Sequence, residues 1–303
     1  MRGVFVDANE SLAKIFEQLG QSGDPEVRIN RNPDFKADQW PEVLDGAEIG
    51  IVDHTALSTE IAKQCTGLKH VVFLGTGARS YMNPEELAGL GITVHLIKGY
   101  GDTAVAESTI ALMWASARVI AMMDREMRAG NWLREDGMQL TGKTLGLIGF
   151  GGIAAEVARI ALGSGLRVIA WNRTPKHFAG VEFVAVEKLL AESHIVSLHL
   201  LLNDETRGFL SRERVASMRP GVILVNTARG ALVDEAAMID ALNSGHIRHA
   251  GLDVFNIEPL PVDHRLTKLP NVTLSAHSSF RTPEASRKLM EAAWEHCRRV
   301  ARG

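Results

Sequence analysis

Residues 143–154 read KTLGLIGFGGIA, and this stretch decides how the rest of the chain is interpreted. Leu145, Leu147, Ile148 and Phe150 form a short apolar run with glycines between them, which is typical of a buried strand in a parallel sheet, where helices cover both faces. Glycines then follow at 149, 151 and 152, and a helical pattern runs over 156–162. This is a G-x-G-x-x-A turn between a strand and a helix, a context that favours dinucleotide binding over an ordinary glycine-rich turn.

Each small residue of this turn has an expected purpose. Gly149 permits the tight turn, Gly151 lets a pyrophosphate approach the backbone, and Ala154 lets helix and strand pack closely. The helix that starts near Gly152 and Ile153 offers free N–H groups and the positive end of its dipole to the phosphates.

The composition narrows the class of protein. A chain of 303 residues suggests about two domains, and 46% hydrophobic with 23% charged residues is typical of a globular protein with a large core. The net charge of -3 gives no basic footprint for nucleic acid or for a membrane surface. We find no signal peptide and no apolar run that spans a bilayer. With only Cys65 and Cys297, we expect no disulfide framework and no metal site, and a reducing, cytoplasmic location.

Strand and helix patterns alternate along the chain, which implies an α/β fold with parallel sheets. Besides the strand in the opening stretch, we expect strands at 3–6, 49–52, 70–74, 92–96, 167–171, 195–200, 221–226, 250–255 and 271–275. We expect helices at 11–19, 59–65, 84–90, 102–127, 156–162, 209–218, 235–242 and 283–301.

Two of these helices carry a prediction about packing. The helix expected over 102–127 is apolar on nearly every side in its first part, so it should be buried, and another subunit could cover it. The helix expected over 283–301 is amphipathic, and we expect its apolar side to pack back onto the N-terminal part of the chain.

The strand over 167–171 ends at the position that usually distinguishes NAD from NADP. An acidic residue about 20 residues beyond the glycines normally binds the adenosine ribose of NAD. Here Asn172, Arg173 and Thr174 occupy that position. A carboxylate would repel the 2′-phosphate of NADP, whereas Arg173 and Thr174 could bind it, so we favour NADP over NAD. The alternative is that Arg173 is only a solvated loop residue.

Three polar residues follow buried strands at the edge where α/β sheets bind ligands. Arg229 follows the strand over 221–226, Glu258 follows 250–255, and His277 follows 271–275. The position of Arg229 directly after a buried strand favours a function over a plain surface arginine. Alone, a histidine is more often structural than catalytic, and a glutamate beside proline usually marks a turn. Their common position at one edge favours a functional site, in which Arg229 holds a carboxylate with two hydrogen bonds. At the end of the strand over 70–74, Gly75, Thr76 and Gly77 could hold a carboxylate through backbone N–H groups or could form a plain loop.

These segments together resemble the D-isomer-specific 2-hydroxyacid dehydrogenase family. The resemblance covers nearly the whole chain and rests on TAVAE at 103–107, GFGGIA at 149–154, VNTARGALVDEAAMIDAL at 225–242, GLDVFNIEPLP at 251–261 and the segment around His277. It implies two doubly wound parallel-sheet domains. A Rossmann-type cofactor domain at 98–282 would be inserted into a flavodoxin-like substrate domain formed by 1–97 and 283–303. Members are usually homodimers, joined largely through the segment that matches 102–127.

The resemblance also implies roles for individual residues. Arg229 would bind the carboxylate and carbonyl of a 2-oxo acid, His277 would be the general acid and base, and Glu258 would hydrogen-bond His277 and tune it. Physical chemistry supports these roles, because a proton must reach the carbonyl oxygen as hydride reaches carbon, and histidine titrates near neutral pH. The residues expected to bind cofactor are Gly149, Gly151, Gly152, Ile153, Asn172, Arg173, Thr174, His199, Thr206, Thr227, Ala228, Arg229, Asp253, His277 and Ser279. The residues expected to bind substrate are Gly75, Thr76, Gly77, Arg229 and His277.

Four departures from the family pattern bear on specificity. Asn172 replaces the acid of NAD-using members, Ala276 replaces a proline before the histidine, Leu201 replaces a common proline, and Arg79 stands where many members have an acid. The single helix beyond His277 leads us to expect no added regulatory domain of the kind some phosphoglycerate dehydrogenases carry.

The favoured function is an NAD(P)-dependent reductase of glyoxylate, hydroxypyruvate or a related small 2-oxo acid, with no nucleic-acid or membrane partner. The alternative is a nucleotide-sensing binding protein, similar to a corepressor, on the same fold. Such a protein could keep all three polar residues, but the chain shows no additional interaction segment.

Overall fold

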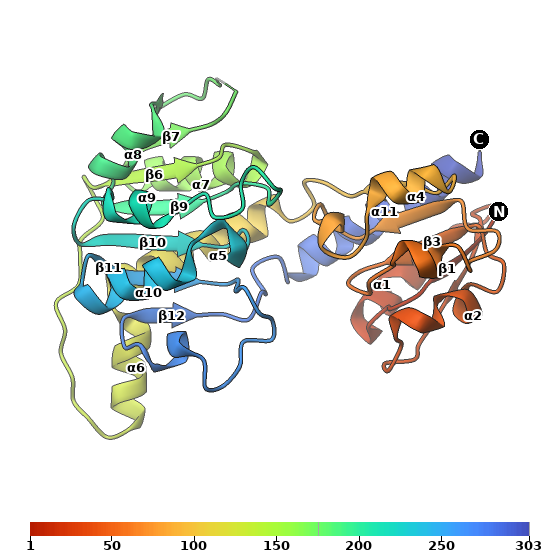
Figure 1. Cartoon of the computed structure of the whole chain (residues 1–303), viewed down its shortest axis with the longest axis horizontal. Coiled ribbons are helices and arrows are strands. Elements are labelled where there is room, and N and C mark those ends of the chain that lie inside the picture. Colours follow the sequence, from red (N-terminus) through yellow and green to blue (C-terminus); the bar gives the residue numbers. More distant parts are fainter. Residues whose placement is uncertain (175, 303) are drawn as a thin grey trace. The chain divides into compact units, whose positions relative to one another are not determined.

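Two parallel β-sheets organise the chain, and each belongs to its own unit (Figure 1). The computed structural model describes residues 1–174 and 176–302. One unit comprises Met1–Gly101 and Arg281–Gly303, and the second, Asp102–Phe280, is inserted between these two segments. Within the described residues the first sheet has five strands and the second has seven, all of them parallel. The α/β fold class with two parallel-sheet domains is therefore confirmed.

The first unit has the strand order β2-β1-β3-β4-β5, which is the flavodoxin-like doubly wound order. Its strands are β1 (Arg2–Phe5), β2 (Glu26–Ile29), β3 (Ile49–Val52), β4 (His70–Phe73) and β5 (Thr93–Leu96). Its helices are α1 (Glu10–Leu19), α2 (Trp40–Leu44), α3 (Thr59–Ala62), α4 (Pro84–Gly89) and α11 (Pro283–Ala301), with short 3₁₀ turns η1 (Ala37–Gln39) and η2 (Ala78–Ser80).

Helices cover both faces of this sheet, and α11 covers the same face as α1. Ile49 and Ile51 of β3 pack with α1 and α11, whereas Val52 packs on the opposite face with α2, α3 and α4. The indole of Trp294 stacks on Phe16 at 4.3 Å between ring centroids, and its Nε1 donates a hydrogen bond to the Phe16 carbonyl (2.8 Å). The C-terminal helix thus packs on the N-terminal part, as its apolar pattern predicts.

The second unit has the strand order β12-β11-β10-β9-β6-β7-β8, a Rossmann-type arrangement that begins at β6. Its strands are β6 (Thr144–Ile148), β7 (Arg167–Trp171), β8 (Val181–Phe183), β9 (Ile195–Leu198), β10 (Val222–Asn226), β11 (Ile247–Leu252) and β12 (Val272–Leu274). Its helices are α5 (Asp102–Ala117), α6 (Ile120–Arg128), α7 (Gly152–Gly163), α8 (Val186–Glu192), α9 (Arg212–Ala216) and α10 (Glu235–Ser244), with 3₁₀ turns η3 (Gly230–Leu232) and η4 (Arg265–Lys268).

Both faces of the second sheet are buried, which explains the continuous apolar runs in its sequence. Leu224 of β10 packs with α8, α9 and α10 on one face, and Ile223 and Val225 pack with α5 and α7 on the other (Figure 1). The carboxyl ends of the strands, where polar residues follow, therefore emerge from a rigid, fully covered sheet.

The prediction of one helix over 102–127 was wrong. The chain forms α5 and α6, bent by 66° at a break where Val119 adopts a left-handed conformation (φ +55°). The Ala117 carbonyl accepts a hydrogen bond from the Met138 N–H (2.7 Å), so the returning segment takes a bond that a continued helix would use. In the described chain no single helix is long and apolar enough to cross a membrane; α5 and α6 reach that length only across the bend.

Other elements also differ from the sequence patterns. The helix expected over 209–218 shortens to α9, because the Ser211 side chain accepts a hydrogen bond from the Arg214 N–H and starts the helix later. The elements β2, α2, β8 and α8 were missed. The strands β2 and β8 have no buried residue among those described, so they lack the apolar signal of a central strand.

A buried histidine on β11 predicts that stability falls in acid. Burial, with the charges of Arg125 and Arg248, lowers the pKa of His249 to about 4, and its Nε2 lies 2.9 Å from the Thr273 hydroxyl. The unfolded chain binds this proton near pH 6.5, so the contribution is complete above that pH and is lost as the pH falls toward 4. His249→Gln should reduce the loss of unfolding free energy between about pH 7.5 and about pH 5 by on the order of 2 kcal/mol.

The measurement is urea unfolding of both proteins at the two pH values. Other histidines titrate equally in both proteins, so the difference isolates position 249. An identical pH slope in the variant would contradict this account.

Candidate active site

Two glycines of the turn after β6 have no room for a side chain, whereas a third has open space around it. Gly149 has φ +88°, and a Cβ there would lie 2.7 Å from the His199 carbonyl oxygen. A Cβ on Gly152 would lie 1.8 Å from Oδ2 of Asp102. A Cβ on Gly151 would meet no atom within 4 Å among the described residues. The open space at Gly151, at the start of a helix without a side-chain cap, fits a phosphate-bearing group.

The end of β7 braces this turn. Oδ1 of Asn172 accepts a hydrogen bond from the Phe150 N–H (3.0 Å), and Nδ2 donates to the Thr174 carbonyl (2.7 Å). Lys176 Nζ donates to the Phe150 carbonyl (2.6 Å). The side chain at position 172 must both donate and accept a hydrogen bond, which an amide can do and an ionised carboxylate cannot. This explains why an asparagine, and not an acid, occupies the position.

His277 and Glu258 form a hydrogen-bonded pair. His277 Nδ1 lies 2.7 Å from Glu258 Oε2, and the other oxygen, Oε1, accepts a bond from the Phe255 N–H (2.8 Å). An ionised carboxylate only accepts, so the proton in this bond lies on Nδ1. The His277 side chain is 32% exposed, and no hydrogen bond in the described part of the chain engages its Nε2. That nitrogen is available to exchange a proton with a bound molecule.

A buried carboxylate fixes the loop that carries the imidazole. His277 has φ +47°, a left-handed conformation that costs about 1–3 kcal/mol for a residue with a side chain. Its N–H donates to the Asp253 carbonyl (2.8 Å). The Asp253 side chain, 1% exposed, accepts bonds from the N–H groups of Ser278 and Ser279 (3.0 Å each) and from the Ser275 hydroxyl. These bonds offset the strain at His277.

Arg229 is held by the turn that follows β10. Asn226 Nδ2 donates to the Arg229 carbonyl (2.9 Å), and Oδ1 accepts from the Ala228 N–H (3.0 Å). At the next residue, a Cβ on Gly230 would lie 2.2 Å from the Phe255 carbonyl carbon. The loops that carry Arg229 and Glu258 are thus in backbone contact, and Glu258 in turn reaches His277.

Further residues predicted to contact cofactor lie around the same edge. Burial lowers the pKa of His199 to about 4, so this imidazole is neutral at physiological pH, and its Nε2 lies 2.9 Å from the Ser197 hydroxyl. The Thr206 hydroxyl donates to the Leu201 carbonyl (2.6 Å) and closes the turn that follows β9.

Two hydroxyl pairs join α5 to this edge. Thr227 shares a hydrogen bond with Thr109 (2.8 Å), and Ser279 shares one with Ser108 (2.7 Å). The hydroxyls of Thr227 and Ser279 therefore have partners within the protein, and α5 supports the loops that follow β10 and β12.

The first unit carries the remaining predicted residues. The Gly75 N–H donates to the Phe73 carbonyl (2.8 Å), and within the described chain the N–H groups of Thr76 and Gly77 make no hydrogen bond. Arg79 is neutralised by an ion pair with Glu85. Only the Thr76 and Gly77 groups of this loop are therefore available to a carboxylate.

The loop after β3 lies beside Gly75–Gly77, because β3 and β4 are neighbours in the sheet. Asp7 holds this loop in place. The Asp7 carboxylate accepts backbone bonds from Asp53, His54 and Thr55 (2.8–2.9 Å). A hydrogen bond from the His54 ring to the Asp53 carboxylate raises the pKa of His54, which is 64% exposed.

Sequence reasoning missed three supporting residues. Asn226 and Lys176 hold turns, and Asp102 lies against Gly152 at the start of α7. Burial, and then the charge of Glu156, raises the pKa of Asp102. Asn226 had a detectable signal, a polar residue at the end of a buried strand. The partners of Lys176 and Asp102 are set by the tertiary fold and left no such signal.

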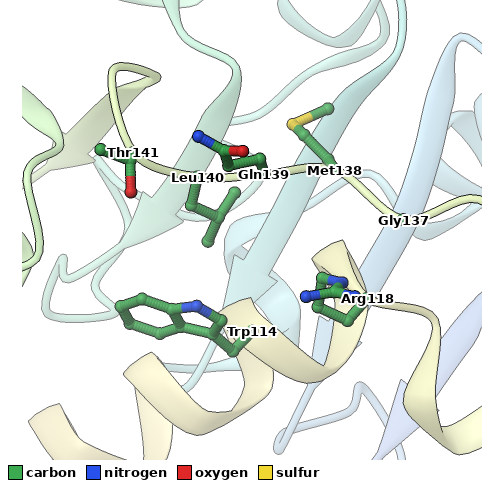
Figure 2. Close-up of a pocket in the computed structure, with 7 residues that line it drawn as sticks. All are labelled: Trp114, Arg118, Gly137, Met138, Gln139, Leu140 and Thr141. Atoms are coloured by element: carbon green, nitrogen blue, oxygen red, sulfur yellow. The ribbon is translucent and has the colours of Figure 1, made fainter.

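The described residues contain one cavity that is separate from these groups (Figure 2). It has a volume of about 330 Å³ and is lined by Trp114, Arg118, Gly137, Met138, Gln139, Leu140 and Thr141. Segment 137–141 leads into the amino end of β6, whereas the glycine turn follows its carboxyl end, so the cavity is not the predicted site. Among the described residues no cluster of His, Cys, Asp and Glu is arranged to hold a metal ion.

The chain is similar to known proteins in both sequence and fold. The family model for the D-isomer specific 2-hydroxyacid dehydrogenase NAD binding domain matches residues 110–279. The chain is 35% identical to hydroxypyruvate reductase of Thermotoga maritima over 94% of each chain. It is 38% identical to glyoxylate reductase of Korarchaeum cryptofilum over 72% of this chain and 69% of that protein. A solved acyclic imino acid reductase in complex with NADPH and D-Arg has a TM-score of 0.87 and 28% identity, covering 100% of this chain and 98% of that one.

The open space at Gly151 predicts a variant that folds but binds dinucleotide poorly. Gly151→Ala adds a methyl group that meets no atom of the described residues within 4 Å, so the unfolding free energy should stay close to that of the native chain. The same methyl group should block the approach of a pyrophosphate and raise the dissociation constant for NAD(P)H at least about tenfold.

Gly163→Ala, at the other end of α7 and also without contacts, is the matched control and should bind normally. Calorimetric titration with the dinucleotide checks the pair. Equal affinities for the two variants would mean that the turn does not hold the phosphates.

Proposed function

The chain belongs to the D-isomer specific 2-hydroxyacid dehydrogenase family, and on that premise we propose that it reduces small 2-oxo acids such as glyoxylate or hydroxypyruvate. Membership implies an oxidoreductase with a nicotinamide cofactor and a small hydroxy- or oxo-acid substrate. The relatives named above are oxidoreductases, so the alternative of a nucleotide-sensing binding protein is not favoured.

The hydrogen bond between His277 and Glu258 is the observation that best supports this proposal. In reduction, Nε2 of His277 would give its proton to the carbonyl oxygen of the substrate while the nicotinamide supplies the hydride. Glu258 accepts from Nδ1 and keeps Nε2 as the nitrogen that faces the substrate. The strained loop held by Asp253 fixes the direction of that nitrogen.

Arg229 would bind the substrate carboxylate. Its Nη1 donates to the Ala228 carbonyl (2.6 Å), which orients the guanidinium and leaves its other N–H groups for a ligand. A fixed cation at this position orients the 2-oxo acid and offsets the charge that develops on its oxygen. We assign further backbone contacts to Thr76 and Gly77 of the first unit, because their N–H groups make no bond in the described protein.

For the cofactor we favour NADP over NAD. Asn172 carries no charge to repel a 2′-phosphate, and the guanidinium of Arg173 is 79% exposed at the end of β7. A structurally similar imino acid reductase was solved with NADPH, which is consistent with this preference.

The helix pair over 102–128 supports a homodimer. None of the described residues of α6 is buried, although Ile120 and Met127 are apolar and 53% and 57% exposed. Trp132, which follows α6 in the chain, is also apolar and 78% exposed. Burial of these side chains against a second copy would remove them from water.

Replacement of the imidazole tests the catalytic proposal. His277→Asn should reduce turnover of glyoxylate or hydroxypyruvate with NADPH by roughly 100- to 10,000-fold and leave cofactor affinity within about twofold, since proton transfer alone is lost. The assay follows nicotinamide absorbance against a panel of 2-oxo acids.

His264→Asn is the matched control for this variant. His264 also faces a glutamate, Glu235 at 3.3 Å, but it caps the start of η4 and does not belong to the proposed site. The control should keep full activity. No turnover of any acid by the native protein, or native rates in His277→Asn, would remove the proposed mechanism.

Charges on the apolar surface of α6 test the homodimer. The double variant Ile120→Glu with Met127→Glu should convert a dimer of about twice the chain mass into a monomer, because burying two carboxylates is unfavourable. Light scattering after size exclusion measures the mass. Val262→Glu, another exposed apolar position (86%), should leave the dimer intact. A native monomer, or a dimer in the double variant, contradicts the proposal.

A further inference from the structure

An ion pair spans the strand that carries the glycine turn. Arg173 follows β7, Glu205 lies in the segment after β9, and β6 lies between these two strands in the sheet. Arg173 Nη1 is 2.6 Å from Glu205 Oε2. The pair therefore reaches across the carboxyl end of β6, above the turn that contains Gly151.

This position coincides with the expected place of the adenosine half of a dinucleotide. A pyrophosphate at the start of α7 directs its adenosine ribose to the end of the second strand of the unit, which is β7. Arg173 is 79% exposed and Glu205 is 71% exposed, and neither makes another hydrogen bond in the described chain. Both side chains can thus turn away from each other at little cost.

We propose that Glu205 sets the cofactor selectivity, because it competes with the 2′-phosphate of NADP for Arg173. The proposal rests on the proposed function, which places a nicotinamide dinucleotide at this turn. The ion pair must open for Arg173 to bind the 2′-phosphate of NADP, whereas NAD has no such phosphate and can leave the pair closed. The Glu205 carboxylate, once displaced, repels that phosphate. Glu205 therefore weakens NADPH binding more than NADH binding.

The neighbouring side chains leave this role to Glu205. Asn172 is uncharged and has both polar atoms bonded to backbone, and Lys176 donates to the Phe150 carbonyl. Asp204 carries the same charge one residue earlier but forms no ion pair in the described structure. A substitution at 204 therefore changes the charge of this loop without freeing Arg173.

The experiment compares Glu205→Gln with Asp204→Asn as its matched control. Dissociation constants for NADPH and NADH are measured by calorimetry, without substrate. Glu205→Gln should lower the NADPH constant about two- to fivefold, the range of an exposed ion pair, and change the NADH constant less than about twofold. Asp204→Asn should shift the ratio of the NADPH constant to the NADH constant by less than half of the shift that Glu205→Gln causes. In the Arg173→Ala background the effect of Glu205→Gln should shrink, because the competition is gone.

The outcomes separate this proposal from the proposed function. If both cofactors bind but Glu205→Gln and Asp204→Asn shift the ratio equally, Glu205 has no special role and the inference is overturned. If the expected shift appears but no 2-oxo acid is reduced, the selectivity role stands and the catalytic proposal fails. If neither nucleotide binds the native protein, both are overturned.

Discussion

The bonds that the buried Asp253 carboxylate makes to the loop after β12 are the constraint on which the site depends. The carboxylate accepts from the N–H groups of Ser278 and Ser279, and the Asp253 backbone carbonyl accepts from the N–H of His277. Together these bonds maintain a left-handed conformation at His277, a residue with a large side chain. Without this anchor the imidazole could rotate away from Glu258, since no regular element extends over residues 275–282. The chemistry thus rests on a residue that need touch no substrate.

The two ends of the second unit's ligand edge are built differently. Around Arg229, Glu258 and His277, buried groups such as Asn226 and Asp253 fix each loop. Around Arg173, a single ion pair joins two exposed side chains. Rigid placement suits proton transfer, which depends on geometry, whereas an exposed pair suits recognition of a charge, which tolerates adjustment.

The sequence predicts the elements whose own residues determine them. The glycine turn, the buried strands and the amphipathic α11 follow from local patterns, and α11 has the predicted bounds. The break at Val119 could not be predicted, because it depends on a bond from Met138 that only the folded chain brings near. The positions of Arg229, Glu258 and His277 at one sheet edge were predictable from strand ends. Asn226 was detectable as a polar residue at the end of a buried strand. The bonds by which Asn226 and Asp253 anchor their loops were not predictable, since their partners are backbone groups that carry no residue-specific signal.

The contact of Gly230 with Phe255 has a consequence for how this edge can change. Because the two backbones touch with no room for a methyl group, neither loop can lengthen or shift without moving the other. The loop of Arg229 after β10 and the loop of Glu258 after β11 therefore keep a fixed spacing and can change only together. An insertion, or a loop transplanted from a relative, must replace both segments together to preserve their spacing.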